Sequence, residues 1–361
     1  MAVDPPKLLP RIGVLGAGSI GVFLAAHLIR AGHRVVLVGR PSMAEEIASC
    51  GVVISTWRGQ SFVLGPQEIT VTAEINALDR CDAVFVTVKS GATWSAAGTI
   101  KAALQRSERS PMCPIVSFQN GVRNPEILGS ALGGYPVLAG MVPFNVVRLG
   151  RGRFHAGTSG RIVLAPFHEG ACQGGGPVAA DMCRILTAAG LPARPDRDAR
   201  AVLWGKLLLN LNNPVNALSG LPLREELSDR GYRNVLALLV DEALGVLRAA
   251  NLSVKVPGVP TPGIVPWILR LPDALFLRVA ATMVRMDPLA RSSMWDDLQR
   301  GRTTEIDDIN GAVVTLAAAV GQGAPLNERI VEVIKRREAQ KDQAESGGMS
   351  AAALRRAILG G

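Results

Sequence analysis

A glycine-rich turn near the beginning of the chain is the feature that most restricts its fold. The turn is Gly16-Ala17-Gly18-Ser19-Ile20-Gly21, and the apolar run 12–15 precedes it. A helical pattern follows to about residue 31, and a second apolar run covers 35–38. In such a unit the first glycine permits the tight turn, the second lets the backbone approach a pyrophosphate, and the third lets helix and strand pack closely. The segment 11–40 therefore predicts a Rossmann-type βαβ unit, with the six turn residues as candidate dinucleotide contacts.

The end of the second predicted strand distinguishes NAD from NADP. NAD sites usually carry an acidic residue there, which bonds the ribose 2′-hydroxyl. This chain instead has Gly39-Arg40-Pro41-Ser42. A guanidinium can bind a 2′-phosphate and stack on the adenine, whereas an acid would repel the phosphate. Arg40 therefore favours NADP (NADPH), and a solvated surface arginine is the alternative interpretation.

Three further apolar runs, at 83–88, 114–118 and 137–141, alternate with helical stretches. This alternation predicts a doubly wound α/β domain with a parallel sheet. Lys89 follows the first run and Asn120 follows the second, so both are candidate ligand contacts at the carboxyl edge of the sheet. An exposed lysine at a helix start and an ordinary Asn-Gly turn are the alternatives. After about residue 145 the pattern changes, and 154–157 with 161–164 predicts an antiparallel hairpin.

Composition and charge exclude several other classes of protein. The net charge of +9 comes from scattered basic residues, and aromatic residues are only 4%, so we expect no nucleic-acid partner. The five cysteines form no CxxC pair and the four histidines form no ligand-like pair. A reducing compartment without a metal site is therefore expected. No apolar run reaches the roughly 18 residues of a membrane-spanning helix, and the first residues lack a signal-peptide pattern. We expect a cytoplasmic protein with no membrane partner.

The chain of 361 residues is long enough for about two domains. Strand patterns end near residue 195, where prolines mark a hinge. Helical patterns then cover about 199–218, 231–250, 273–286 and 305–320. We therefore predict a dinucleotide-binding domain at 1–195, an all-helical substrate domain at 196–341, and a loosely attached tail at 342–361.

The predicted helix at 199–218 carries the candidate catalytic residues. Lys206, Asn210 and Asn213 recur at helical spacing among leucines. Burying a lysine and amides on an apolar helix is costly unless they meet a ligand or one another. The alternative is a lysine that reaches solvent and asparagines that end the helix. A second polar patch contains Ser293 and Glu305, and Glu305 alone could simply be a favourable acid in a first helical turn.

These motifs together resemble the ketopantoate reductase (2-dehydropantoate 2-reductase) family over roughly residues 11–340. The glycine turn and Arg40 are similar to its NADP motif, and Lys89 and Asn120 are similar to its residues after the sheet strands. The segment 154–157, Phe-His-Ala-Gly, is similar to its strand after the Rossmann domain. Lys206 to Asn210 resembles the helix of its catalytic lysine, and Ser293 and Glu305 match its Ser…Thr-Glu-Ile-Asp spacing.

The resemblance implies a Rossmann domain followed by a helical domain like that of 6-phosphogluconate dehydrogenase. It implies NADPH-dependent reduction of 2-dehydropantoate to pantoate, in pantothenate biosynthesis, by a monomer or homodimer. Lys206 would donate the proton and Glu305 would assist it or contact the cofactor. Asn120, Asn210, Asn213 and Ser293 would bind the 2-oxo acid.

Two departures from the family pattern keep other functions open. Asn213-Pro214 follows the lysine helix one residue early, and the segment 254–289 is long, apolar and rich in proline. The segment is predicted to pack on the helical domain, to form a subunit contact, or to cover the substrate site as a lid. Reduction of another 2-oxo acid by the same scaffold is therefore one alternative function. A noncatalytic NADP-binding regulator is the other, and the pairing of Lys206 with Glu305 disfavours it.

Overall fold

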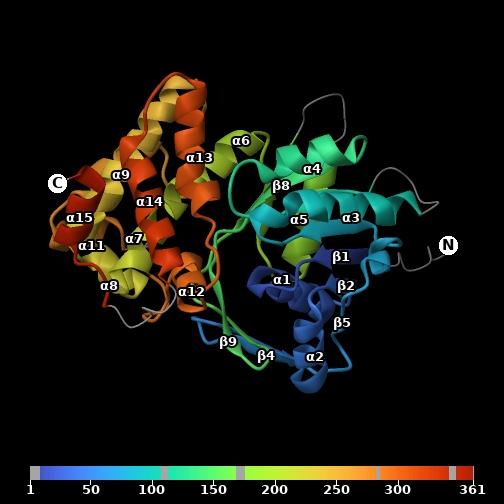
Figure 1. Ribbon diagram of the computed structural model, residues 1–361. Coiled ribbons are helices and arrows are strands. Elements are labelled where there is room, and N and C mark those ends of the chain that lie inside the picture. Colours follow the sequence, from blue (N-terminus) through green and yellow to red (C-terminus); the bar gives the residue numbers. More distant parts are fainter. Residues whose placement is uncertain (1–8, 107–112, 168–174, 282–284, 341–346, 361) are drawn as a thin grey trace. The chain divides into compact units, whose positions relative to one another are not determined.

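The chain forms two compact units, shown in Figure 1. The computed structural model describes residues 9–106, 113–167, 175–281, 285–340 and 347–360. Unit 1 consists of residues 1–119, 123–156 and 160–199. Unit 2 consists of residues 120–122, 157–159 and 200–361. The predicted order, an α/β Rossmann-type domain followed by a helical domain, is confirmed.

An eight-stranded sheet forms the centre of unit 1, in the order β12-β11-β8-β7-β6-β1-β2-β5. Along the sheet, the neighbouring strands β8, β7, β6, β1, β2 and β5 are parallel to one another, and β11 pairs antiparallel with β8. Nearly every residue of β1, β6, β7 and β8 is buried, as expected for parallel strands covered on both faces. The bounds are β1 Arg11–Leu15, β2 Arg34–Val38, β5 Val71–Thr72, β6 Ala83–Val86, β7 Ile115–Ser117, β8 Val137–Met141, β11 Ile162–Pro166 and β12 Ala193–Pro195.

A second, four-stranded sheet has the order β4-β3-β10-β9. Helix α1 contacts both sheets, and its buried side chains join them into one core. The strands are β3 Val52–Thr56, β4 Ser61–Leu64, β9 Val146–Gly150 and β10 Arg153–Ala156. The helices of unit 1 are α1 Ser19–Arg30, α2 Pro41–Cys50, η1 Ile75–Leu78, η2 Ser90–Ala92, α3 Thr93–Gln105, α4 Asn124–Leu132 and α5 Gly175–Ala188.

The predicted hairpin between 154–157 and 161–164 is wrong. Strand β10 pairs with β3 and β9 in the small sheet, whereas β11 pairs with β8 and β12 in the large one. The short connection between them, 157–159, belongs to unit 2. Both strands bury their apolar side chains, and burial in two different sheets was as compatible with the sequence pattern as pairing with each other.

Helices are the only regular elements among the described residues of unit 2, and irregular segments connect them. Its largest buried cluster comes mainly from α6, α7, α9, α13 and α14. Asp229 accepts a hydrogen bond from the backbone of Gly231 at 2.6 Å, which caps the long helix α9. The helices are α6 Ala199–Asn210, α7 Asn212–Ser219, α8 Leu223–Ser228, α9 Arg230–Ala249, η3 Pro262–Ile264, α10 Val265–Leu269, α11 Asp273–Val279, α12 Ser293–Gln299, α13 Ile306–Ala319, α14 Pro325–Ala339 and α15 Ala351–Leu359.

The single helix expected at 199–218 is two helices. Helix α6 ends at Asn210 and α7 begins at Asn212, so Leu211 separates them. Pro214 cannot donate an amide hydrogen bond to a preceding helical turn, which accounts for a break close to it. The prediction of one continuous helix over 199–218 is therefore wrong, and Asn213 lies in α7 rather than in the helix that carries Lys206 and Asn210.

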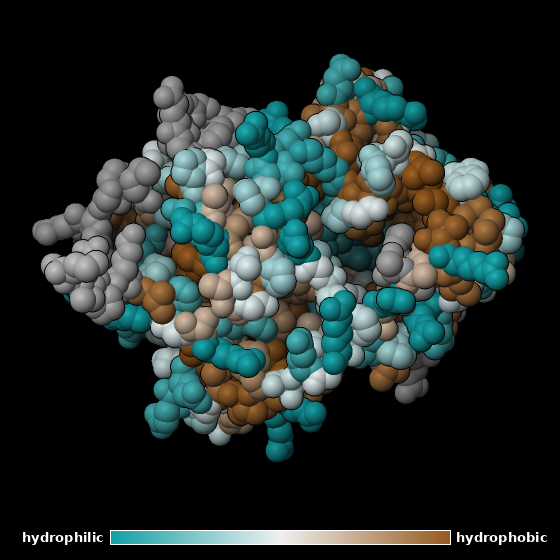
Figure 2. All heavy atoms as spheres, turned by 180° about the vertical axis from the view of Figure 1, so that it is seen from behind, coloured by the Kyte–Doolittle hydropathy of each residue, from teal (hydrophilic) through white to brown (hydrophobic). Residues whose placement is uncertain are grey.

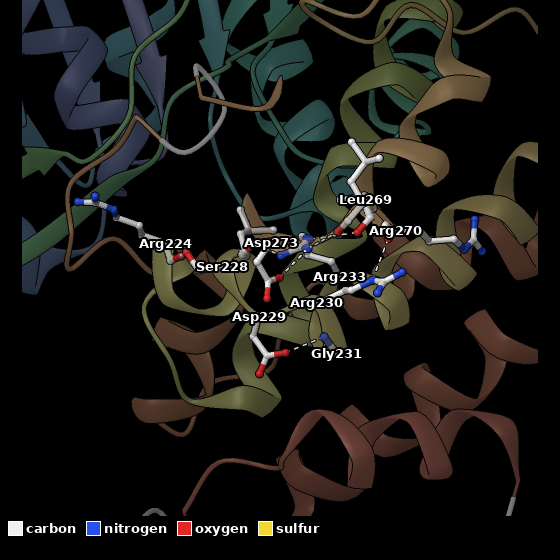
Figure 3. A network of polar contacts seen from close by, with 11 residues as sticks. Arg224, Ser228, Asp229, Arg230, Gly231, Arg233, Leu269, Arg270 and Asp273 are labelled. Carbon is white, nitrogen blue, oxygen red and sulfur yellow. Dashed lines mark hydrogen bonds and ion pairs between the residues drawn. The ribbon is translucent and has the colours of Figure 1, made fainter. Parts of the chain in front are cut away.

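The apolar segment 254–289 packs on α9 through a buried arginine. Arg233 of α9 is fully buried and donates to the backbone oxygen of Leu269 at 3.0 Å (Figure 3). The same guanidinium donates to the backbone oxygen of Leu271 at 2.7 Å. It also pairs with Asp273 at 2.9 Å and lies 4.2 Å from the ring centre of Phe276. A buried guanidinium with this many acceptors holds α10 and α11 against α9, because losing any acceptor would leave a charge unsatisfied.

The beginning and the middle of this segment differ in how closely they pack. Its beginning crosses α6, where the backbone nitrogen of Lys255 donates to Ala201 at 3.0 Å. Its middle leaves Trp267 of α10 61% exposed. On the face of the molecule drawn in Figure 2, hydrophobic patches stand among hydrophilic ones. The contacts of Arg233 with Leu269, Leu271 and Asp273 support the predicted packing on the helical domain, and the role of a lid around Trp267 stays a prediction.

The prediction of a loosely attached tail is wrong for the part that the structure describes. Leu354 and Ile358 of α15 are fully buried in the core of unit 2. The hydroxyl of Tyr232 donates to the backbone oxygen of Met349 at 2.8 Å, and Arg329 donates to that of Ile358 at 3.1 Å. Leu354 and Ile358 lie four residues apart, so they share one face of α15 and bury it together.

Within the described residues, no helix is long and apolar enough to cross a membrane. The described cysteines, Cys50, Cys81, Cys113 and Cys183, are free thiols. Burial raises the pKa of Cys113 to about 12. Over the same residues, no cluster of three histidine, cysteine or acidic side chains is placed to hold a metal ion.

Candidate active site

The glycine turn has two crowded positions and one open position. A Cβ on Gly16, whose φ is +118°, would lie 2.7 Å from the backbone nitrogen of Val88. A Cβ on Gly21 would lie 2.0 Å from the oxygen of Gly16, so neither position accepts a side chain. A Cβ on Gly18 would meet no atom within 4 Å. The open position is the one at which a pyrophosphate approaches the backbone, so the turn fits a dinucleotide.

The first turn of α1 is prepared for negative charge. Gly18 is the N-cap of α1, it offers no side chain to the helix, and no acidic residue stands in the first turn. Ser19 and Ile20 open the helix there, where unpaired amide groups and the helix dipole favour an anion. These residues could hold the phosphates of a dinucleotide.

Thr87 supports the turn from the neighbouring strand end, and sequence reasoning missed it. Its hydroxyl donates to the oxygen of Gly16 at 2.7 Å, and it also reaches that of Leu15 at 3.2 Å. The signal was available, because Thr87 is the one polar residue inside the apolar run 83–88. A polar residue in a buried strand needs a partner.

Arg40 lies beside the glycine turn. Gly39 packs so closely on Ala17 that a Cβ on Gly39 would lie 2.4 Å from the Cβ of Ala17. Arg40 follows as the N-cap of α2 and is exposed. Its guanidinium forms no hydrogen bond or ion pair with the described part of the chain, so it is available to a ligand phosphate. Lys89, also exposed, is the N-cap of η2 after the end of β6.

A buried polar network precedes Asn120 at the end of β7. Gln119 donates to the hydroxyl of Thr93 at 2.7 Å, and Thr93 donates to the amide oxygen of Asn124 at 2.7 Å. Asn124 donates in turn to Ser90 at 3.0 Å. These residues were not predicted as site residues, and they hold the strand end from which Asn120 projects. Gly121, with φ of +86°, then makes the turn that an L-side chain would strain.

Unit 2 brings together three of the predicted site residues. The amide of Asn210 donates to the amide oxygen of Asn120 at 3.3 Å, and the amide of Asn120 donates to the carboxylate of Glu305 at 2.9 Å. The three lie up to 185 positions apart in the chain. Glu305 is the N-cap residue of α13 and is partly buried. The resulting row of amide and carboxylate groups can bind hydroxyl and carboxylate groups of a small ligand.

Lys206 lies one helical turn before Asn210 on α6 and is only partly exposed. Burial lowers the pKa of its ammonium group to about 8. It forms no ion pair with Glu305 and no hydrogen bond within the described residues. A lysine with a lowered pKa and no partner can give up a proton near neutral pH. This combination is typical of functional sites.

Close packing beside Lys206 contributes to this environment. A Cβ on the preceding residue, Gly205, would lie 1.9 Å from the backbone oxygen of Lys255. The beginning of the 254–289 segment therefore lies directly on α6. Gly205 was not predicted to matter, and only the tertiary packing shows why no larger residue fits there.

The last two predicted site residues, Asn213 and Ser293, have no side-chain hydrogen bond to the row of Asn210, Asn120 and Glu305. Asn213 is in α7, and its backbone oxygen accepts a hydrogen bond from Ser292 at 3.1 Å. Ser292 caps α12 by accepting from the backbone of Trp295 at 3.2 Å. Ser293 is the exposed first residue of α12. The structure therefore does not join the side chains of Asn213 and Ser293 to the row formed by Asn210, Asn120 and Glu305.

A dinucleotide turn and a lysine with a row of amides and a carboxylate define the class of the protein: a dinucleotide-dependent oxidoreductase. The family models agree. The model for ketopantoate reductase PanE/ApbA matches residues 12–169, and the model for its C-terminal domain matches residues 198–338. The chain belongs to the ketopantoate reductase family, an NADP-dependent oxidoreductase family.

Individual relatives match along most of their length. A 2-dehydropantoate 2-reductase of Archaeoglobus fulgidus is 26% identical over 334 residues, covering 90% of this chain and 97% of the relative. The crystal structure of a PanE/ApbA family ketopantoate reductase from Ralstonia eutropha JMP134 has a TM-score of 0.73 at 29% identity, covering 92% of this chain and 99% of that one. A D-mandelate dehydrogenase with NADH and anilino(oxo)acetate shares the fold with a TM-score of 0.73 at 17% identity, over 92% and 99% of the two chains.

Proposed function

We propose that this protein reduces 2-dehydropantoate (ketopantoate) to (R)-pantoate with NADPH, as a step of pantothenate biosynthesis. The observation that carries the proposal is Lys206, a partly buried lysine with a lowered pKa, one turn from the row of Asn210, Asn120 and Glu305. The names of the curated relatives point to the same substrate.

Lys206 is the proposed proton donor. NADPH, when bound, supplies the hydride that reduces the ketone. The ketone oxygen becomes an alkoxide, and an ammonium group whose pKa is about 8 both stabilises the developing charge and donates the proton. No histidine follows residue 168 in the chain, so the helical unit holds no imidazole for this task.

The amide row is proposed to position the substrate. Asn120 and Asn210 offer amide groups to the carboxylate and carbonyl of a 2-oxo acid, with Ser293 and Asn213 as further contacts. Glu305 holds Asn120 through the 2.9 Å hydrogen bond and can accept a hydrogen bond from a substrate hydroxyl or the cofactor. A buried amide row discriminates well, because a ligand without matching groups leaves those amides unpaired.

The cofactor contacts are proposed from unit 1. The turn from Gly16 to Gly21, including Ala17, Ser19 and Ile20, would hold the pyrophosphate, and Arg40 would bind the 2′-phosphate. Lys89 and Asn120 would contact the nucleotide at the carboxyl edge of the sheet. We assign NADP binding to residues 1–195 and catalysis to residues 196–341.

The test is NADPH oxidation by the purified protein with ketopantoate beside a panel of other 2-oxo acids. We expect the largest kcat/KM with ketopantoate and a clear preference for NADPH over NADH. Oxidation that is faster with another 2-oxo acid would replace the substrate and keep the reaction type. No oxidation with any of them, while NADPH binds, would overturn the proposed reaction.

Reduction of a different 2-oxo acid is the second candidate function. The lysine helix ends at Asn210, so Asn213 belongs to the next helix, α7, and the beginning of the 254–289 segment packs on α6 at Gly205. Both features change the surroundings of the proposed substrate site without touching the glycine turn. We further propose that the protein is cytoplasmic and that it is a monomer or homodimer. A size measurement of the purified protein distinguishes the monomer from the homodimer.

A further inference from the structure

A second buried carboxyl group lies in unit 2, outside the row of proposed catalytic residues. Glu226 of α8 is fully buried. Its Oε2 accepts a hydrogen bond from the amide of Asn212 at 2.9 Å and lies 3.5 Å from that of Asn216. Both asparagines belong to α7. A fully buried carboxylate is costly unless it is paired with a cation or amply hydrogen-bonded.

Two oxygen atoms in this cluster have no partner. Oε1 of Glu226 and Oδ1 of Asn212 are both buried, and neither has a hydrogen bond. Both are acceptors when the carboxyl is ionised, so they cannot satisfy each other. They belong to the same two side chains that are already joined by the 2.9 Å hydrogen bond. One added proton turns one of these acceptors into a donor.

We propose that Glu226 is held as a neutral carboxylic acid in a cyclic pair with the amide of Asn212. In this pair the amide nitrogen donates to Oε2, and the carboxyl proton on Oε1 is donated to the amide oxygen. A single proton thereby satisfies both orphaned oxygens and removes the buried charge. The proton comes from solvent, so no other group changes its state.

The electrostatic surroundings favour the neutral form. Burial raises the pKa of Glu226 to about 8, against the opposing effect of the hydrogen bonds from α7, and the charge of Asp229 raises it further. Helix α7 carries no titratable side chain. On α9, Arg233 directs its guanidinium to backbone oxygens and to Asp273 rather than to Glu226. Tyr232 is the other titratable group that faces the carboxyl from α9. On α8 itself, Arg224 and Glu225 are exposed.

The pair supports the beginning of α7 and, through it, α12. Asn216 donates to the backbone oxygen of Leu221 at 3.0 Å and accepts from the backbone nitrogen of Ser292 at 2.8 Å. Ser292 caps α12, whose first residue is Ser293, and α7 begins directly after Asn210 and Leu211. Glu226 is therefore a positioning residue for the proposed substrate contacts Asn210 and Ser293. This second part of the inference rests on the proposed function.

The first test compares Glu226→Gln with the wild type as a function of pH. A group whose folded pKa is raised from 4.5 to about 8 contributes stability below pH 4.5 that is lost as the pH rises to about 8. The neutral amide of glutamine mimics the acid and does not titrate. Between pH 5 and 8 the unfolding equilibrium constant of the wild type should rise relative to that of Glu226→Gln by roughly 400-fold. The matched control is Glu225→Gln, an exposed neighbour, for which this ratio should stay constant.

A ratio for Glu226→Gln that does not change with pH would overturn the neutral acid. A variant that is less stable than the wild type even at pH 5 would overturn it too, because the amide would then fail to replace the acid. Should Glu226→Gln not fold, carbon-13 NMR of wild-type protein labelled at the glutamate carboxyl decides the matter. One resonance should titrate near pH 8, and titration of all of them at the ordinary value of about 4.3 would reject the inference.

Kinetics test the positioning role. Glu226→Ala leaves the amides of α7 without their acceptor, and we expect its KM for ketopantoate to rise about 10-fold with the KM for NADPH unchanged. Glu226→Gln should bring the KM for ketopantoate back to within about 2-fold of the wild type. Equal changes of both KM values, or no rescue by glutamine, would reject the positioning role. Wild-type protein that does not reduce ketopantoate would reject the proposed function alone, since the stability and NMR results do not depend on it.

Discussion

The glycine turn of unit 1 and the amide row of unit 2 are built in opposite ways. The turn is six consecutive residues, and its geometry follows from backbone sterics at Gly16 and Gly21. The row joins Asn210, Asn120 and Glu305 from three separate segments, by hydrogen bonds of 3.3 Å and 2.9 Å. A contiguous site needs only the local fold, whereas an assembled site needs the packing of the whole unit. Substitutions should therefore act on one site and spare the other.

The largest effect is expected at Lys206. Lys206→Ala removes the proposed proton donor, and kcat should fall roughly 10²–10⁴-fold while NADPH binding persists. Steady-state kinetics and fluorescence titration of NADPH measure the two quantities separately. Lys335→Ala is the matched control, because Lys335 is an exposed lysine of unit 2 paired with Asp307 at 2.7 Å. A fully active Lys206→Ala variant would require another proton donor.

The converse separation is expected at Gly18. A Cβ at this position meets no protein atom within 4 Å, so Gly18→Ala should fold normally. It should nevertheless obstruct the approach of a pyrophosphate and raise the KM for NADPH by about 10²-fold, a cost of roughly 2.7 kcal/mol. Gly91→Ala, which likewise meets no atom within 4 Å, is the control. Unchanged NADPH affinity in Gly18→Ala would show that the open position is not used by the cofactor.

A smaller effect, restricted to one cofactor, is expected at Arg40. Loss of a charge-assisted contact to the 2′-phosphate, worth roughly 1.5–3 kcal/mol, should raise the KM for NADPH about 10-fold or more in Arg40→Ala. The KM for NADH should change little, because NADH has no 2′-phosphate. Arg58→Ala, in the same unit, serves as the control. Equal losses with both cofactors would mean that Arg40 does not bind the 2′-phosphate.

The smallest effect is the pH dependence of the reaction itself. A lysine with a pKa of about 8 is protonated below this pH, so kcat should be constant at lower pH and fall to about half near pH 8. In Lys206→Arg the donor stays protonated, and this fall should disappear. The kcat profile from pH 6 to 9, at saturating NADPH and ketopantoate, provides the measurement. A profile that is identical in both proteins would assign the titration to another group.

The accuracy of prediction from the sequence differs between local features and long-range contacts for the same reason. The strand at 137–141 was predicted with its observed ends, and the glycine turn with all its residues, because a buried apolar run and a GxGxxG spacing are local signals. The pairing partners of 154–157 were predicted wrongly, since partner choice depends on distant strands. The attachment of α15 was missed, because the Gly347-Gly348 stretch before it is typical of a linker, whereas the burial of Leu354 and Ile358 depends on packing with the rest of unit 2.

The sequence by itself determined the order of the two folds, the presence of a dinucleotide turn, and the identity of the residues that could act as acid, amide and carboxylate. Tertiary structure decided which of them meet: Asn120 with Asn210 and Glu305, but not the side chains of Asn213 and Ser293. It also decided the protonation chemistry, because the lowered pKa of Lys206 and the raised pKa of Glu226 both arise from burial. Spacing along a chain limits which residues share a helix face, whereas desolvation depends on every element that covers a group.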